Sequence, residues 1–204
     1  MTLGTAAIRG VVGPLFVGHG AQKLWGKFGG HGLEGTGGYF EQLGLRPGQR
    51  HAKAAGMAEL AGGALLTLGA LTPVATTLIS STMITAIRKA HVKNGPWVTE
   101  GGFEYNAVLI AAMTAITDHG PGALSVDAAL FPRLKGPALA ALGLGAAAAG
   151  SYLATERFND QAPAPQEGEG VPGDPAANDE ARFSRDAADA ELPSAVTPLD
   201  TTAT

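Results

Sequence analysis

Five side chains that can transfer protons, form ion pairs or bind metals recur near one end of several apolar stretches. His19 and Lys23 close the first stretch, Glu59 lies inside the second, His91 follows the third and Glu104 opens the fourth. If consecutive stretches are antiparallel helices, these positions meet at one end of a bundle. An ionisable group inside an apolar helix is costly to bury and marks a functional site by default. The pattern therefore predicts one polar site built from several helices.

Helical spacing indicates which of these side chains face protein. His19 and Lys23 are four residues apart, so they share one face of the first helix. Glu59 has Gly56 and Gly63 on its own face, and small residues there let a second helix approach closely. We therefore expect Glu59 to face another helix rather than lipid.

Two readings of this site remain open from the residues. In the first, Glu59 pairs with Lys23 or Arg88 to hold the bundle together, and Glu104 is only an acid favoured at a helix start. In the second, a quinone-like molecule binds between the helices, with His19 and Glu59 as the catalytic proton carriers. The residues expected to line the pocket or hold the ligand are Lys23, Arg88, His91 and Glu104.

Metal and haem sites are weaker alternatives. Two imidazoles and two carboxylates, from His19, Glu59, His91 and Glu104, suit Zn, Mn or Fe, but their spacing matches no diagnostic metal motif, so we predict no metal site. A haem held non-covalently by His19 and His91 is weaker still. The chain has no Cys, which excludes disulfides, thiolate metal sites and covalently attached c-type haem. The cofactor is therefore unknown, with quinone as the candidate.

Composition divides the chain into two parts. Residues 1–154 carry 11 Lys and Arg and 7 Asp and Glu, whereas residues 155–204 carry 3 basic and 11 acidic residues. The acidic part is rich in Pro, Ala, Asp and Glu and buries too little apolar surface to offset chain entropy, so it is predicted to be a disordered tail. An alternative is that this tail docks a partner protein.

The apolar stretches predict an all-α polytopic membrane helix bundle. Four of them form the expected core in residues 1–136, and a fifth, almost pure Ala, Leu and Gly, adds a further transmembrane helix in 137–154. The first is expected to be an uncleaved span. Residues 25–50 are expected to be a Gly-rich connection along the headgroups. The predicted spans are 3–24, 51–71, 74–90, 103–117 and 137–154.

Four sequence motifs resemble those of the DoxX family of small bacterial integral membrane proteins. They are ArgGlyValValGlyProLeuPheValGlyHisGlyAlaGlnLys at 9–23, AlaGlyMetAlaGluLeuAlaGlyGlyAlaLeuLeu at 55–66, GlyGlyPheGluTyrAsn at 101–106 and GlyProGlyAlaLeuSerValAsp at 120–127. The resemblance covers about residues 3–127, in the same order. It implies a four-helix membrane core and a redox-associated role, in oxidation complexes of quinol or thiosulfate.

Carried over by motif position, the resemblance implies three signature residues besides those of the polar site. These are Arg9, Ser125 and Asp127, and the predicted topology places Ser125 and Asp127 at the opposite end from His19. We expect these two to cap or position the end of the helix at 103–117.

Basic residues predict the orientation in the membrane. Eight Lys and Arg fall at the end that carries His19, against three at the other end, which places the former in the cytoplasm and the N-terminus outside. The expected partners are the lipid bilayer and a redox protein that docks on the acidic tail, and the expected location is the cell membrane with several passes. Nucleic-acid binding is disfavoured because the basic residues are juxtamembrane and the tail is acidic.

Overall fold

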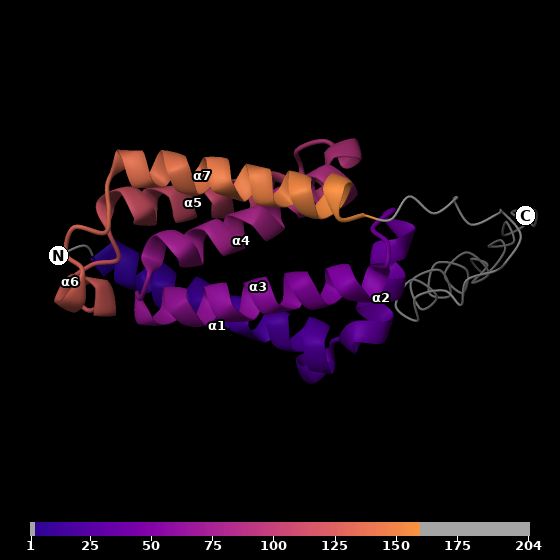
Figure 1. Ribbon diagram of the computed structural model, residues 1–204, viewed down its shortest axis with the longest axis horizontal. Helices are drawn as coiled ribbons and strands as arrows, with labels where there is room; N and C mark the ends of the chain where they lie inside the picture. The colour runs from indigo at the N-terminus through magenta and orange to yellow at the C-terminus, as the bar shows by residue number, and fades with distance from the viewer. Residues whose placement is uncertain (1–2, 160–204) are drawn as a thin grey trace, which may run out of the picture. The chain divides into compact units, whose positions relative to one another are not determined.

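The computed structural model describes residues 3–159, and every regular element in this range is a helix. The long helices are α1 (Leu3–Trp25), α3 (Gly48–Leu68), α4 (Thr72–Ala86), α5 (Glu104–His119) and α7 (Pro137–Tyr152). Two shorter helices, α2 (Gly32–Gln42) and α6 (Val126–Leu130), lie at opposite ends of the long ones (Figure 1). The all-α prediction is thereby confirmed. Of the predicted disordered tail, 155–204, residues 160–204 lie outside the described residues, whereas residues 155–157 belong to a helical turn, so the predicted start of the tail was wrong.

The long helices form one compact unit in which neighbours along the chain run antiparallel. α1 packs on α3, α3 on α4, α4 on α5, and α7 on both α4 and α5. Their shared core consists of apolar side chains from four of these helices: Phe16, Leu66, Ala75, Ile79, Leu109, Met113 and Ile116. α7 thus packs directly on two of the helices that were predicted to form the four-helix core.

Glycines allow α1 and α3 to pack backbone against backbone. A Cβ atom at Gly20 would lie 2.7 Å from the carbonyl oxygen of Gly56, and one at Gly63 would lie 2.6 Å from that of Gly13. No side chain fits at such distances, so the close contact requires glycine. This contact brings the α3 face that carries Glu59 against α1.

The segment expected to be a Gly-rich connection contains a helix, so that expectation was wrong. α2 includes three glycines after its first residue, and isolated helices of this composition are unstable. Here α2 packs on α3, and a Cβ atom at Gly37 would lie 2.9 Å from the backbone nitrogen of Gln49. Tertiary packing therefore overrides the low helix propensity of glycine.

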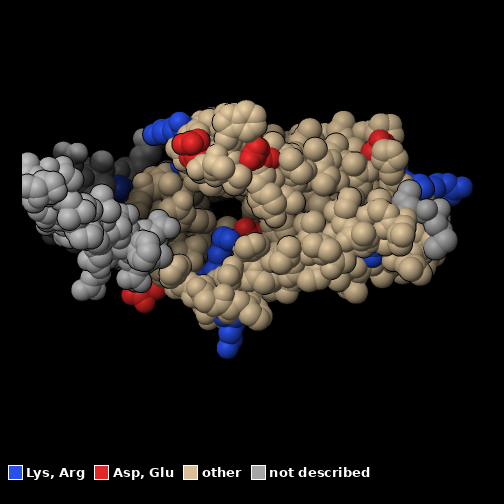
Figure 2. Space-filling view, turned by 180° about the vertical axis from the view of Figure 1, so that it is seen from behind, with Lys and Arg blue, Asp and Glu red and all other residues tan. Residues whose placement is uncertain are grey.

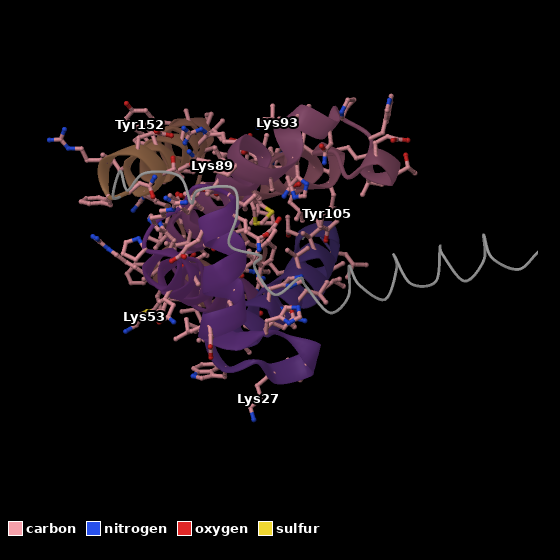
Figure 3. The ribbon with its side chains drawn as sticks, turned by 90° about the vertical axis from the view of Figure 1, so that its right-hand side faces the viewer. Lys27, Lys53, Lys89, Lys93, Tyr105 and Tyr152 are labelled. Atoms are coloured by element: carbon pink, nitrogen blue, oxygen red, sulfur yellow. The ribbon has the colours of Figure 1, made fainter. Side chains whose placement is uncertain are left out.

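Two helix ends continue as π-helical turns. α4 passes into the turn Ile87–His91, and α7 passes into the turn Leu153–Arg157. Both turns lie at the end of the unit that carries α2, together with the 3-10 turns Lys27–Gly29, Val92–Asn94 and Val98–Glu100. Seen along the bundle from this end, Lys27, Lys53 and Lys93 come from different elements around it (Figure 3). We call this end the basic end.

One helix in the described range is long and apolar enough to cross a membrane. It is Pro137–Arg157, with 21 residues and a mean hydropathy of 1.4. α4 and α5 have 15 and 16 residues, fewer than the ~20 of a typical crossing. The fifth predicted span, 137–154, is therefore the one that meets the requirement, and the other four do not meet it by length and composition.

Candidate binding cavity between the helices

A cavity of ≈ 440 Å³ lies between the helices near the basic end. Its walls come from α1, α2, α3, α4, α5 and both π-helical turns, and they are mainly apolar. In the space-filling view, a hollow opens there on the side of the bundle, with a basic and an acidic group on its wall (Figure 2). The titratable side chains that line the cavity are His19, Lys23, Tyr39, His51, Glu59, Lys89, His91 and Tyr105.

An ion pair between a buried carboxylate and a partly exposed ammonium group forms part of the cavity wall. The Nζ atom of Lys23 lies 2.7 Å from Oε2 of Glu59, whose side chain is 5% exposed. Within the described residues, Oε2 has this ion pair and no hydrogen-bond partner. A buried carboxylate needs such an ion pair, because leaving one charge of a buried pair alone costs about 3–5 kcal/mol. The pair joins α1 to α3, in agreement with the first interpretation, in which Glu59 pairs with Lys23 to hold the bundle together.

His19 lies one helical turn before Lys23 and is held by its own helix. Its Nδ1 is 2.9 Å from Oε1 of Gln22, and its ring packs edge-on against Phe16. Because an amide oxygen only accepts, this contact places the proton of a neutral imidazole on Nδ1 and leaves Nε2 as an acceptor. His19 is therefore held in one orientation at the cavity, and its neutral form presents Nε2 as a hydrogen-bond acceptor.

Two further histidines line the cavity, and each is also fixed by a carbonyl group. Nδ1 of His91 lies 2.8 Å from the carbonyl oxygen of Gly101, and because a carbonyl oxygen only accepts, Nδ1 is the donor. Nε2 of His51 lies 3.3 Å from the carbonyl oxygen of Arg46. His51 was missed in the sequence, although it stands eight residues before Glu59 on the same face of α3, which is the pattern that points to it.

The two π-helical turns are joined by the carboxylate of Glu156, which belongs to the turn after α7. Oε1 of Glu156 accepts hydrogen bonds from Nη2 of Arg88 at 3.0 Å and from Nζ of Lys89 at 3.1 Å. Arg88 also donates to the hydroxyl groups of Ser151 and Thr155. Arg88 thus points to α7 and its π turn and does not line the cavity, whereas its neighbour Lys89 does. π turns occur often at functional sites.

Glu104 is at the same end of the unit as these residues but not in the cavity wall. Its Oε1 accepts a hydrogen bond from the backbone nitrogen of Val98 at 2.9 Å. The carboxylate therefore orders the loop before α5. Of the six residues predicted to form the catalytic and pocket groups, the structure brings His19, Lys23, Glu59 and His91 together and leaves Arg88 and Glu104 outside.

Arg9 lies at the opposite end and is 5% exposed. Its guanidinium group donates to four carbonyl oxygens, those of Leu66, Thr67, Pro121 and Leu124, at 2.6–3.0 Å. Leu66 and Thr67 are in the last turn of α3, where carbonyl groups lack helical partners and a cation is favoured. Arg9 is therefore a structural clamp between α1, α3 and the segment before α6.

Asp127 and Ser125 lie at the same end as Arg9 and cap helices. The two carboxylate oxygens of Asp127 accept from the backbone nitrogens of Leu71 and Thr72, at the start of α4. Ser125 caps α6 by accepting from the backbone nitrogen of Ala128. The capped ends are those of α4 and α6, which corrects the expectation that they cap the helix at 103–117. Leu71 has a φ of 45°, and the Asp127 contact supports this rare conformation.

No group of three or more His, Asp or Glu side chains within residues 3–159 is close enough together to hold a metal ion. The four residues that were considered as metal ligands do not form a cluster, since Glu104 is bound to the Val98 backbone outside the cavity. The cavity offers instead an ion pair, oriented imidazoles and an apolar wall.

These features define a class of protein: an all-α helix bundle with a cavity between its helices and a Lys–Glu ion pair in the cavity wall. Residues 4–92 match the model of the DoxX family, and the chain carries a DoxX domain over this range. The matched range includes α1 to α4 and the first π-helical turn, hence Arg9, His19, Lys23 and Glu59. The resemblance found in the sequence is thereby confirmed over this range, while the motifs at 101–106 and 120–127 lie outside the matched residues. DoxX proteins are membrane-associated, which supports a bilayer environment for this chain.

Comparison with curated proteins gave no match, and neither did comparison with solved structures.

Proposed function

We propose that this chain is a multi-pass cell-membrane protein that serves as an oxidoreductase or redox-complex subunit, and that its cavity binds a quinone-like molecule. The observation that supports this most strongly is the Lys23–Glu59 ion pair beside an oriented His19 in the wall of an apolar cavity. A pair that served only to join two helices would need no cavity next to it.

The size and lining of the cavity support a small organic ligand. Its volume of ≈ 440 Å³ falls within the range of roughly 300–1,000 Å³ that is usual for ligand pockets. Phe16 and Leu109 contribute apolar surface for a ring, while Lys23, Glu59 and His19 supply a few polar groups on one wall. Apolar walls with few convergent polar groups are typical of such sites.

Each polar group has a role in this proposal. Nε2 of His19 accepts a proton from a ligand hydroxyl group or returns it, and Glu59 acts as the second proton carrier. The Lys23 ammonium stabilises negative charge that develops on a ligand oxygen. Lys89 adds positive potential at the cavity, where the sequence had placed Arg88 among the pocket residues. Electrons are exchanged with a partner redox protein, for which the acidic tail is the proposed docking segment.

Replacing Glu59 with Gln tests the proton role. Gln keeps the size of the side chain and an oxygen for the Lys23 ammonium, so we expect the protein to fold. Loss of a proton carrier should lower quinone turnover about 10²-fold or more. The measurement is a reduced-minus-oxidised absorption spectrum of protein purified from native membranes in mild detergent, followed by quinone turnover.

Glu104→Gln is the matched control, because Glu104 is a carboxylate at the same end but outside the cavity. It should leave turnover unchanged. Full turnover in the Glu59→Gln variant would contradict the proton role. A flat spectrum from folded wild-type protein, without quinone or other chromophore, would favour the second function below.

The second candidate function is a non-catalytic membrane scaffold or transport accessory protein whose tail recruits a soluble partner. The observation that favours it is that the charged residues also join helices: Lys23 and Glu59 link α1 to α3, and Glu156 links α7 to the α4 turn.

Deleting residues 160–204 tests this function. The cut must follow Asn159, because its amide group bonds with the backbone of Gly44 and Arg46 and a cut after Ala154 would break these contacts. A scaffold should lose its co-purifying partner and keep its thermal unfolding midpoint. Retention of the partner after this deletion would rule out recruitment by the tail.

A further inference from the structure

The cavity lies between two helices that pack on different neighbours. α1 packs on α3 and α2, whereas α5 packs on α4 and α7. Both contribute to the cavity wall, α1 through residues such as Leu15 and His19 and α5 through residues such as Tyr105 and Leu109. The hollow seen in Figure 2 lies on the side of the bundle, not at the end of the helices.

Side chains from three helices form the mouth of this hollow. Leu15 of α1, Tyr39 of α2 and Tyr105 of α5 each line the cavity, yet they are 53%, 50% and 57% exposed. A side chain that both lines a cavity and is half exposed stands where the cavity meets the outside. The ion pair is farther in, since the Glu59 side chain is 5% exposed.

The parts of α1 and α5 that flank the mouth carry no Asp, Glu, Lys or Arg. α1 has no charged residue from Gly10 to Gln22, and α5 has none from Tyr105 to Thr117. Large apolar side chains are exposed on both flanks, Val11 at 61% and Val108 at 64%. In a bilayer such a surface faces acyl chains, because charged groups are excluded from that region.

From this arrangement we propose that the cavity opens sideways into the bilayer and that its ligand is an amphiphile with a long apolar chain, which enters between α1 and α5. The polar head of the ligand reaches the Lys23–Glu59 pair, and its chain stays in the mouth between Leu15 and Tyr105. This inference rests on the proposed function, since it names the form and route of the molecule that binds the same cavity.

The test compares two probes that differ only in their chain. One is a quinone with a ring alone, and the other is the same ring with a ten-carbon alkyl chain. Binding of each probe is measured on the full chain in lipid nanodiscs, for the wild type, Leu15→Trp and Val11→Trp. Val11 is the matched control, because it is exposed on the same face one turn away and does not line the cavity.

We expect the wild type to bind the chain-bearing probe more tightly than the ring alone. Leu15→Trp should weaken binding of the chain-bearing probe about tenfold, because excluding about two chain methylenes from the mouth has an effect of that size. Binding of the ring alone should change much less, and Val11→Trp should affect neither probe. Thermal unfolding of each variant checks that the fold is intact.

Three results would contradict a cavity that opens sideways to a chain-bearing ligand while leaving the proposed function in place. They are equal affinity of the wild type for both probes, unchanged binding in Leu15→Trp, and equal weakening of both probes in that variant. Binding of neither probe to the wild type would overturn the proposed function and the mouth together.

Discussion

At the scale of single residues, Arg9 and Lys23 show two different uses of a cation inside an apolar helix. Arg9 has no carboxylate among its hydrogen-bond acceptors and instead donates to four carbonyl groups. Lys23 pairs with one carboxylate and faces a cavity. The planar fork of a guanidinium group serves several fixed acceptors, whereas an ammonium group acts as a compact charge. Arg9 thus stabilises the fold, and Lys23 is available to a ligand.

Arg9→Lys should therefore destabilise the fold without changing the cavity. An ammonium group has three donors and cannot reach four carbonyl groups on two segments, so buried acceptors lose their partners. We expect the free energy of unfolding to fall by about 3 kcal/mol, which is the usual cost of leaving buried acceptors without a charged donor. Chemical unfolding in detergent measures it. Arg133→Lys is the control, since Arg133 is exposed at the same end, and a similar loss there would contradict the clamp.

At the scale of elements, apolar pattern located the long helices well. The predicted spans at 3–24, 51–71, 74–90 and 103–117 correspond to α1, α3, α4 and α5, with ends that differ by a few residues. Prolines and glycines mark several ends, such as Gly69 with its left-handed φ of 61° after α3. Local sequence sufficed for the ends of α1, α3 and α5, because Gly26, Gly69 and Gly120 follow them with positive φ.

Elements that depend on tertiary contacts were not predictable in the same way. α2 is Gly-rich and is stabilised by packing on α3, so its propensity argued against it. The two π-helical turns are joined by the contacts of Arg88 and Lys89 with Glu156, which link positions nearly 70 residues apart. The same limit applies to the site: the sequence placed His19, Lys23, Glu59 and His91 at one end, but the direction in which Arg88 points is set by α7.

At the scale of the whole described unit, the two ends differ in the basic residues that they expose. The basic end carries Lys27, Lys53 and Lys93 on different elements (Figure 3). At the other end Arg9 is buried on carbonyl groups, which leaves Arg133 and Lys135 as the exposed basic residues of the described chain there. Burial of Arg9 increases the contrast that the sequence alone gave. Such asymmetry in short connections favours a cytoplasmic location for the basic end.

Reporter insertions at three points test both the orientation and the number of passes. The points are after Gly29 at the basic end, after Pro132 at the other end, and after Thr204; Gly29 and Pro132 are exposed. We expect the first and third reporters to be cytoplasmic and the second external, since α3, α4, α5 and α7 then each cross once. Accessibility to a membrane-impermeant label in intact cells measures the side. If all three reporters lie on the opposite sides from those expected, the number of passes stands and the orientation is inverted. If the reporters after Gly29 and Pro132 lie on the same side, the bundle does not span the membrane as proposed, because α1 and α3 run the full length between those two ends.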